Sequence, residues 1–160
     1  MPIDTRAQHQ AGPRLALPFA LMGTACVVSG GLLSAVTASA PSQHTAWISA
    51  YLVLVAGVAQ VGLGVGQWLL ARSRPSGGIV AAELVGWNLG SAAVIVGTLV
   101  DAVRLVDAGG VLLVLALVLV VHATRGSTSS WRWTRYAFRG LVVILLVSIP
   151  IGLVLARIGA

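Results

Sequence analysis

The sequence predicts an all-α integral membrane protein, a polytopic helical bundle with five transmembrane helices. Of its 160 residues, 58% are hydrophobic and only 9% are charged, with a mean hydropathy of +0.96. Soluble domains have about 25% charged residues, and a soluble domain of this length could not bury so much apolar surface in one core. We therefore expect lipid, rather than water, to surround most of the chain.

The apolar residues form five long runs, and these runs define the predicted spans. A helix needs about 20 apolar residues to cross the hydrocarbon core of a bilayer. The runs are continuous rather than alternating, which favours helices over the strands of a membrane barrel. Residues 1–14 form a polar tail, and residues 15–160 form one transmembrane domain with spans at 15–38, 46–70, 78–100, 105–121 and 138–156.

The arginines predict how the spans are oriented. All ten Lys or Arg residues are arginine, and with five spans eight of them lie on one side, in the tail and two loops. Arg104 and Arg157 lie on the other side. Because cytoplasmic loops have the excess of cationic residues, we expect a cytoplasmic N-terminus and a C-terminus outside. The lysine-free composition, rich in Ala, Val, Gly and Leu, indicates a bacterial source and so the cell (inner or plasma) membrane.

Aromatic and cationic residues alternate just before the last span. This cluster comprises Trp131, Arg132, Trp133, Arg135 and Arg139. Such a pattern can stack on the bases of single-stranded nucleic acid. Beside a span, however, it is typical of rings at the headgroup level and arginines bound to anionic lipid. We therefore predict a bilayer with anionic headgroups as partner, and no nucleic acid.

Four polar residues inside the second and third spans are the candidate functional residues: Glu83, Gln67, Gln60 and Asn88. An acidic side chain in mid-span costs roughly 2.5–3.5 kcal/mol on insertion scales and is usually turned inward. If these two spans pair antiparallel, Gln67 lies level with Glu83, and Gln60 lies level with Asn88. We predict a hydrogen bond between Gln67 and Glu83. Asn88 is about 140° around the helix from Glu83, so we expect it to meet a hydroxyl of the first span.

Glu83 is the residue most suited to a function. A carboxyl in a low-dielectric environment is stabilised in its neutral form and can exchange a proton. The alternative is a structural, hydrogen-bonded acid. The four polar residues together would then line a substrate or proton path.

Small residues recur at intervals of three and four in the first three spans, where they let helix backbones approach. Examples are Gly57 and Gly64 in the second span and Gly86, Gly90 and Gly97 in the third. These faces either hold the chain's own helices together or bind a partner. Segments 23–36 and 90–103 also match at seven of fourteen positions. Shared composition is the preferred explanation of this match, and duplication of a two-helix unit is the alternative.

No cofactor or metal site is predicted. His44, Asp101 and Asp107 are only weak candidates for metal ligands, since ion pairing with Arg104 explains the two carboxylates. His44 and His122 are expected at opposite membrane faces, roughly 30 Å apart, so one haem cannot use both. Cys26 is the single cysteine, which excludes an internal disulfide.

No nucleophile with a neighbouring base stands out in the sequence, which argues against an enzyme. The leading hypothesis is a non-enzymatic subunit or accessory protein of a larger assembly, bound to another membrane protein or to copies of itself. A second hypothesis is a small transporter or permease component, proton-coupled through Glu83. A third is a membrane redox protein that holds haem through one histidine and an external ligand.

Overall fold

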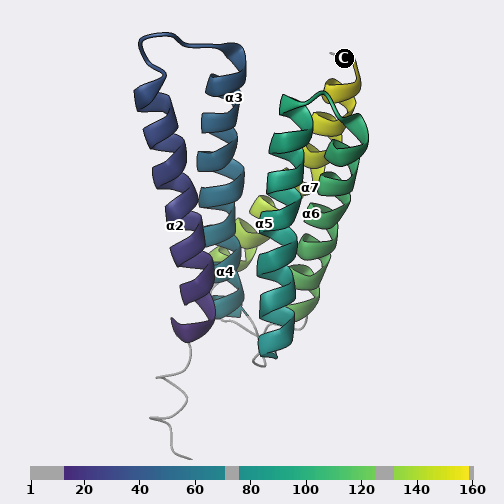
Figure 1. Cartoon of the computed structure of the whole chain (residues 1–160). Coiled ribbons are helices and arrows are strands. Elements are labelled where there is room, and N and C mark those ends of the chain that lie inside the picture. The colour runs from purple at the N-terminus through teal and green to yellow at the C-terminus, as the bar shows by residue number, and fades with distance from the viewer. Residues whose placement is uncertain (1–12, 71–75, 125–131, 159–160) are drawn as a thin grey trace, which may run out of the picture.

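The computed structural model describes residues 13–70, 76–124 and 132–158, with side chains for 16–70, 76–124 and 133–149. Every regular element in these ranges is a helix, which confirms the all-α prediction. Their order along the chain is α2 (Pro13–Val36), α3 (Gln43–Tyr51), the π-helix η1 (Leu52–Ala59), α4 (Gln60–Leu70), α5 (Gly77–Leu99), α6 (Val103–Thr124) and α7 (Arg132–Ile158). Figure 1 shows them running up and down in one bundle, with α3, η1 and α4 joined end to end. We refer to this continuous helix, Gln43–Leu70, as the second span.

Four helices within the described residues are long and apolar enough to cross a membrane: Ala16–Val36, Gln43–Leu70, Gly77–Leu99 and Val103–Thr124. At about 1.5 Å per residue, each reaches across a hydrocarbon core of about 30 Å. Their outward faces expose large apolar side chains, among them Leu21, Leu54, Leu89 and Leu115. Apolar surface on this scale is unstable in water. The chain is therefore a multi-pass helical membrane protein.

The helix ends differ from the predicted boundaries where polar residues cap or extend a helix. The second span begins at Gln43 because Ser42 caps it: the Thr45 amide donates to Ser42 Oγ at 3.1 Å, and the Ser42 amide donates to Thr45 Oγ1 at 3.1 Å. This reciprocal capping box satisfies amides that the first turn leaves without partners. The last helix begins at Arg132 rather than at Phe138, since its first turns contain polar residues that a hydropathy criterion omits.

Two helical hairpins form the framework, and glycines close both of them. In the first hairpin, α2 packs against the second span: a Cβ at Gly23 would lie 2.9 Å from the Gly57 carbonyl oxygen, and one at Gly57 would lie 3.0 Å from that of Gly23. In the second, α5 packs against α6 in the same reciprocal way. A Cβ at Gly90 would lie 2.9 Å from the Gly109 carbonyl oxygen, and one at Gly109 would lie 2.7 Å from the Gly90 carbonyl oxygen. Alanine fits at none of these positions unless the backbone moves. These glycines therefore hold the chain's own helices together.

The two matched sequence segments occupy equivalent places in these hairpins. Gly23 and Gly90, which align, each lie on the first helix of a hairpin and face a glycine of the second. Gly30 and Gly97 also align, and a Cβ on either would lie 2.8 Å from backbone of the returning helix. Close approach at glycines is general for membrane helices, so shared composition also accounts for these contacts.

A tight turn joins α5 to α6. Asp101 has a φ of 52°, in the left-handed region, and the Ala102 amide donates to the Gly97 carbonyl oxygen at 2.8 Å. This six-to-one hydrogen bond across a left-handed residue is a Schellman motif, which usually has glycine at the position of Asp101. The Leu105 amide then bonds the Ala102 carbonyl oxygen at 2.9 Å, which starts α6 directly.

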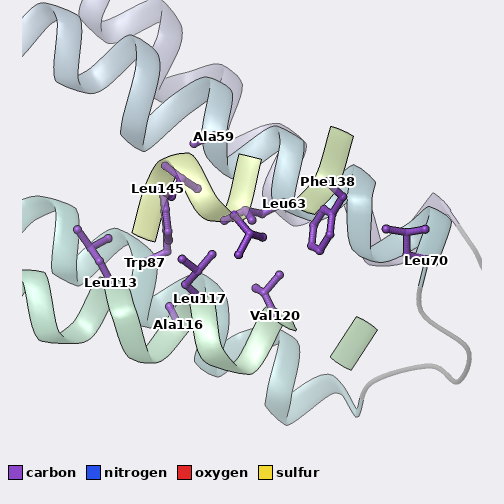
Figure 2. Close-up of a cluster of buried hydrophobic side chains, with 11 residues drawn as sticks. Ala59, Leu63, Leu70, Trp87, Leu113, Ala116, Leu117, Val120, Phe138 and Leu145 are labelled. Atoms are coloured by element: carbon purple, nitrogen blue, oxygen red, sulfur yellow. The ribbon is translucent and has the colours of Figure 1, made fainter. Parts of the chain in front are cut away.

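Helix α7 packs against α4 and α6 and completes the core between the two hairpins. Its buried face comprises Phe138, Val142 and Leu145, at the spacing of one helical stripe. Its opposite face exposes the apolar side chains of Val143 and Ile144. Figure 2 shows the core cluster, which contains Ala59, Leu63, Leu70, Trp87, Leu113, Ala116, Leu117, Val120, Phe138, Val142 and Leu145.

The glycine contacts predict opposite effects of the same substitution at different sites. Gly90→Ala and Gly109→Ala should each lower the free energy of unfolding by about 1–3 kcal/mol, because the new methyl group meets backbone atoms. The measurement is reversible unfolding in mixed micelles, followed by circular dichroism.

Gly31→Ala is the matched control. A Cβ at Gly31 would meet nothing within 4 Å, and alanine is better than glycine in a helix by about 0.8–1.0 kcal/mol. This variant should therefore be as stable as the original chain or more so. Equal effects at Gly31 and Gly90 would contradict the close approach of α5 and α6.

Candidate functional site

Five polar side chains with known burial are buried: Ser49, Gln60, Gln67, Glu83 and Ser91. Glu83 and Gln60 are both 0% exposed. Glu83 is also the one residue of an ionisable type among these buried polar side chains. Because a buried polar group costs free energy unless it is hydrogen-bonded, the partners of these five groups decide what the site can do.

The predicted hydrogen bond between Gln67 and Glu83 is confirmed. Gln67 Nε2 donates to Glu83 Oε2 at 2.6 Å, between α4 and α5. The other carboxyl oxygen, Oε1, is buried and has no hydrogen-bond partner. Glu83 is therefore fixed through one oxygen, while the second is available to another donor or to a proton.

A line of polar groups extends from Glu83 along α5. Trp87 and Ser91 follow Glu83 at intervals of four residues, so all three share one face of the helix. Trp87 Nε1 and Ser91 Oγ are both buried and have no hydrogen-bond partner. Over eight residues this face extends about 12 Å toward the α5–α6 turn.

The second span presents polar groups to the same interface. Gln60 precedes Gln67 by seven residues and so shares its face of the helix. Both amide atoms of Gln60 are buried without a hydrogen-bond partner. By the rise of an α-helix, Gln60 lies about 10.5 Å from Gln67, level with the stretch between Trp87 and Ser91.

The π-helix η1 explains how Tyr51 reaches this interface. In an α-helix, residues nine apart lie on opposite sides, and this would turn Tyr51 away from Gln60. The π-helix η1, with its wider turns, lies between the two residues and reduces the rotation from Tyr51 to Gln60. Tyr51 is thereby brought to the side of Gln60, and its hydroxyl faces the Ser91 side chain. We name the set Gln67, Glu83, Trp87, Gln60, Ser91 and Tyr51 the polar column.

The buried polar atoms of the polar column are both donors and acceptors. Each buried polar group without a partner costs about 1–3 kcal/mol. Water molecules, which make two to four hydrogen bonds in buried sites, can satisfy groups of this kind. An interface with this chemistry can bind water or pass a proton, and it contains no buried cation to attract an anion among the side chains whose burial is known.

Asn88 does not join the polar column. Its Nδ2 donates to the Leu84 carbonyl oxygen of its own helix at 2.8 Å, and its side chain is half-buried. The prediction that it meets a hydroxyl of the first span was wrong, since Ser29 and Ser34 are exposed. A carbonyl four residues back is within reach of an asparagine side chain without any help from a second helix.

The weak metal candidates are not brought together. Within the described ranges, no three His, Cys, Asp or Glu side chains gather into a group that could hold a metal ion. His44 is exposed at the start of α3, and Asp101 is exposed in the α5–α6 turn. His122 is exposed in the last turn of α6, and α6 ends at the opposite end of the bundle from the start of α3 (Figure 1). The two histidines therefore lie at different ends of the bundle.

The aromatic and cationic cluster lies at the start of α7 as far as it is described. Trp133 is 86% exposed and Tyr136 is 57% exposed, while Arg139 is exposed and Arg135 is half-buried. Trp131 and the side chain of Arg132 lie outside the described residues. Exposed rings and cations at a helix end fit the headgroup level of a bilayer, and their binding to anionic lipid stays a prediction.

No protein-family model, no curated protein and no solved structure matches this chain.

Sequence reasoning identified Gln67, Glu83 and Gln60 but missed the other three members of the polar column. Trp87 and Ser91 could have been found from the four-residue spacing that starts at Glu83. Tyr51 could not, because an α-helical second span would turn it away from Gln60, and the sequence has no signal for the π-helix.

The Gln67–Glu83 hydrogen bond predicts a non-additive pair of substitutions. Gln67→Leu should lower the free energy of unfolding by about 1–3 kcal/mol, because it leaves the buried carboxyl with no donor. The double variant Gln67→Leu, Glu83→Leu should be close to the original chain, since both polar groups are then gone. Unfolding in mixed micelles, analysed as a double-mutant cycle, measures the coupling.

Asn88→Leu serves as the control for loss of an amide. Its hydrogen bond stays within one helix, so the free energy of unfolding should change by no more than about 0.5 kcal/mol. Additive effects of the two leucine substitutions at Gln67 and Glu83 would show that the pair does not stabilise the contact between α4 and α5.

Proposed function

We propose that this chain is a small proton-translocating membrane protein, a transporter or a transport component, in which Glu83 binds and releases the proton. The single observation behind this proposal is that Glu83 is 0% exposed and uses only one carboxyl oxygen, toward Gln67. A purely structural acid would be expected to satisfy both oxygens, because each buried unpaired group has a cost.

The Gln67 amide supports this role in both protonation states. It donates to Glu83 Oε2. An N–H group can donate to a carboxylate and also to the carbonyl oxygen of a neutral carboxyl. The proton then resides on Oε1, the oxygen without a partner. From there the unpartnered groups of Trp87, Gln60 and Ser91 offer hydrogen bonds to water toward the other end of the bundle.

The chemistry of the polar column favours a proton over a larger substrate. Glu83 and Gln60 are completely covered by protein, so a bulky solute would need a large rearrangement to reach them. An anion finds no buried cation among the side chains with known burial. A proton needs only a titratable group and a few hydrogen-bonding neighbours.

Within this proposal the chain crosses the cell membrane five times, with its N-terminus in the cytoplasm and its C-terminus outside. Support comes from the 27-residue length of α7, from its apolar outward face and from its packing against α4 and α6. Figure 1 supports it as well, since α7 ends beside the α5–α6 turn, away from the start of α2. The orientation follows from the eight arginines on one side.

A role as a subunit of a larger assembly is the second candidate. The observation that favours it is Gly31 on α2, where a Cβ would meet nothing within 4 Å. A glycine in an open helix surface is a place where another helix can approach closely. The partner would be another membrane protein or a second copy of this chain.

Glu83→Gln should abolish proton flux while preserving the fold. Glutamine has nearly the same shape and can still accept the hydrogen bond from Gln67, but it cannot bind and release a proton. The measurement uses purified protein in liposomes with a pH-sensitive dye inside and a potassium-diffusion potential as driving force. Flux should fall to the level of protein-free liposomes, and Glu83→Asp should retain part of it.

Asp101→Asn is the matched control, because this exposed carboxyl lies in the α5–α6 turn, outside the polar column. It should conduct like the original chain. Equal flux in the original chain and in Glu83→Gln would refute the role of Glu83. A purified original chain that moves no protons at all would favour the subunit role instead.

The five-span topology predicts the fate of a reporter fused after Ala160. A C-terminal alkaline phosphatase, which is active only outside the cytoplasm, should be active, and a fluorescent protein that folds only in the cytoplasm should be dark. The same reporters fused after Thr124 should give the opposite result, because α6 ends at the cytoplasmic side in this topology. C-terminal and Thr124 fusions that both fluoresce would show that α7 does not cross the membrane.

A further inference from the structure

An apolar groove of about 100 Å³ lies between α6 and α7. Its lining is entirely aliphatic and consists of Val114, Leu117, Val118, Val121 and Leu146. Val118 and Leu146 are both exposed, so the groove opens to the outside of the bundle. Since α6 is one of the helices that can cross a membrane, the groove opens to lipid rather than to water.

A cation lies in line with this groove. Arg139 precedes Leu146 by seven residues, which puts both on nearly the same side of α7, about 10.5 Å apart along the helix axis. Arg139 is exposed, and the exposed Tyr136 lies one turn before it. Val121, at the other end of the lining, is close to Thr124, where α6 ends. The groove therefore runs toward the end of the bundle that holds this arginine.

We infer that the α6–α7 face binds one phospholipid with an anionic headgroup, a segment of its acyl chain against the groove and its phosphate at Arg139. An aliphatic lining matches a hydrocarbon chain, and a guanidinium can hold a phosphate through paired hydrogen bonds. The Tyr136 hydroxyl can donate to the same headgroup. This inference rests on the proposed five-span topology, because α7 must lie in the bilayer for its groove to meet an acyl chain.

The headgroup, rather than the chain, determines the preference for this lipid. Lipid tails are as apolar as the aliphatic side chains of the groove, so transfer of a tail from bilayer to groove gains no hydrophobic free energy. One Arg near an anionic surface contributes about fivefold in affinity, the equivalent of about 1 kcal/mol. Lipids with the same tails and a different headgroup charge should therefore differ in binding.

The experiment is native mass spectrometry of the full chain in micelles, titrated with dioleoyl phosphatidylglycerol or dioleoyl phosphatidylcholine. We expect one phosphatidylglycerol to bind more tightly than phosphatidylcholine. Arg139→Gln should lower the affinity for phosphatidylglycerol about fivefold and leave the affinity for phosphatidylcholine unchanged. Val118→Phe, which fills the groove, should lower the affinity for both lipids.

Two matched controls separate the groove from general membrane affinity. Arg104→Gln removes an exposed arginine near the opposite end of the bundle, and Val85→Phe enlarges an exposed valine of α5 that does not line the groove. Both should bind phosphatidylglycerol like the original chain. Equal affinity of the original chain for the two lipids, or an equal loss in Arg104→Gln and Arg139→Gln, would overturn the site. So would a protein dimer that Val118→Phe dissociates, since the groove would then be an interface between copies.

The C-terminal reporters distinguish failure of the site from failure of the topology. If the reporter is outside and the two lipids bind equally, only the lipid site is wrong. If the C-terminal reporter and the reporter after Thr124 are both in the cytoplasm, α7 does not cross the membrane, and the topology and the lipid site are both wrong.

Discussion

Helices in a bilayer gain little by hiding apolar side chains from one another, because lipid solvates those side chains equally well. Close packing has to hold them together instead, and in this chain it depends on glycine. Gly23 faces Gly57 and Gly90 faces Gly109, each pair so close that a single added methyl group would meet a backbone oxygen. These contacts produce two tightly packed helical hairpins, α2 with the second span and α5 with α6, and α7 packs against both.

The contact between the two hairpins differs from the contacts within them, because it is made by side chains rather than by closely approaching backbones. Gln67 and Glu83 form the hydrogen bond that links α4 to α5. Trp87 fills the neighbouring space together with Leu63 and residues of α6 and α7 (Figure 2). A joint made of side chains can reorganise without breaking the hairpins, since rotamer changes cost far less than separating two packed backbones. The polar column, to which we assign the proposed proton transfer, thus lies at the more adaptable of the two contacts.

The sequence was sufficient for the class of fold, for four spans to within a few residues and for the Gln67–Glu83 pair. These features follow from local hydropathy and from depth matching between adjacent helices, which need no tertiary information. The position of Asn88 was wrong because an asparagine can bond its own helix as easily as a distant serine. The π-helix was not foreseeable, since Leu52–Ala59 is an ordinary apolar run and no residue in it demands a wider turn.

The π-helix also bears on the choice between a structural and a functional role for Glu83. π-Helical turns are rare and occur frequently at functional sites, so an arrangement that requires one needs a reason. Here η1 lies between Tyr51 and Gln60, and the buried Tyr51 hydroxyl is added beside Ser91 to an interface that already had several buried polar groups. Stability alone favours the reverse, an α-helical second span that turns Tyr51 away from the interface. The accumulation of buried polar groups beside a carboxyl with one unused oxygen therefore supports the proposed proton transfer over a purely structural role for Glu83.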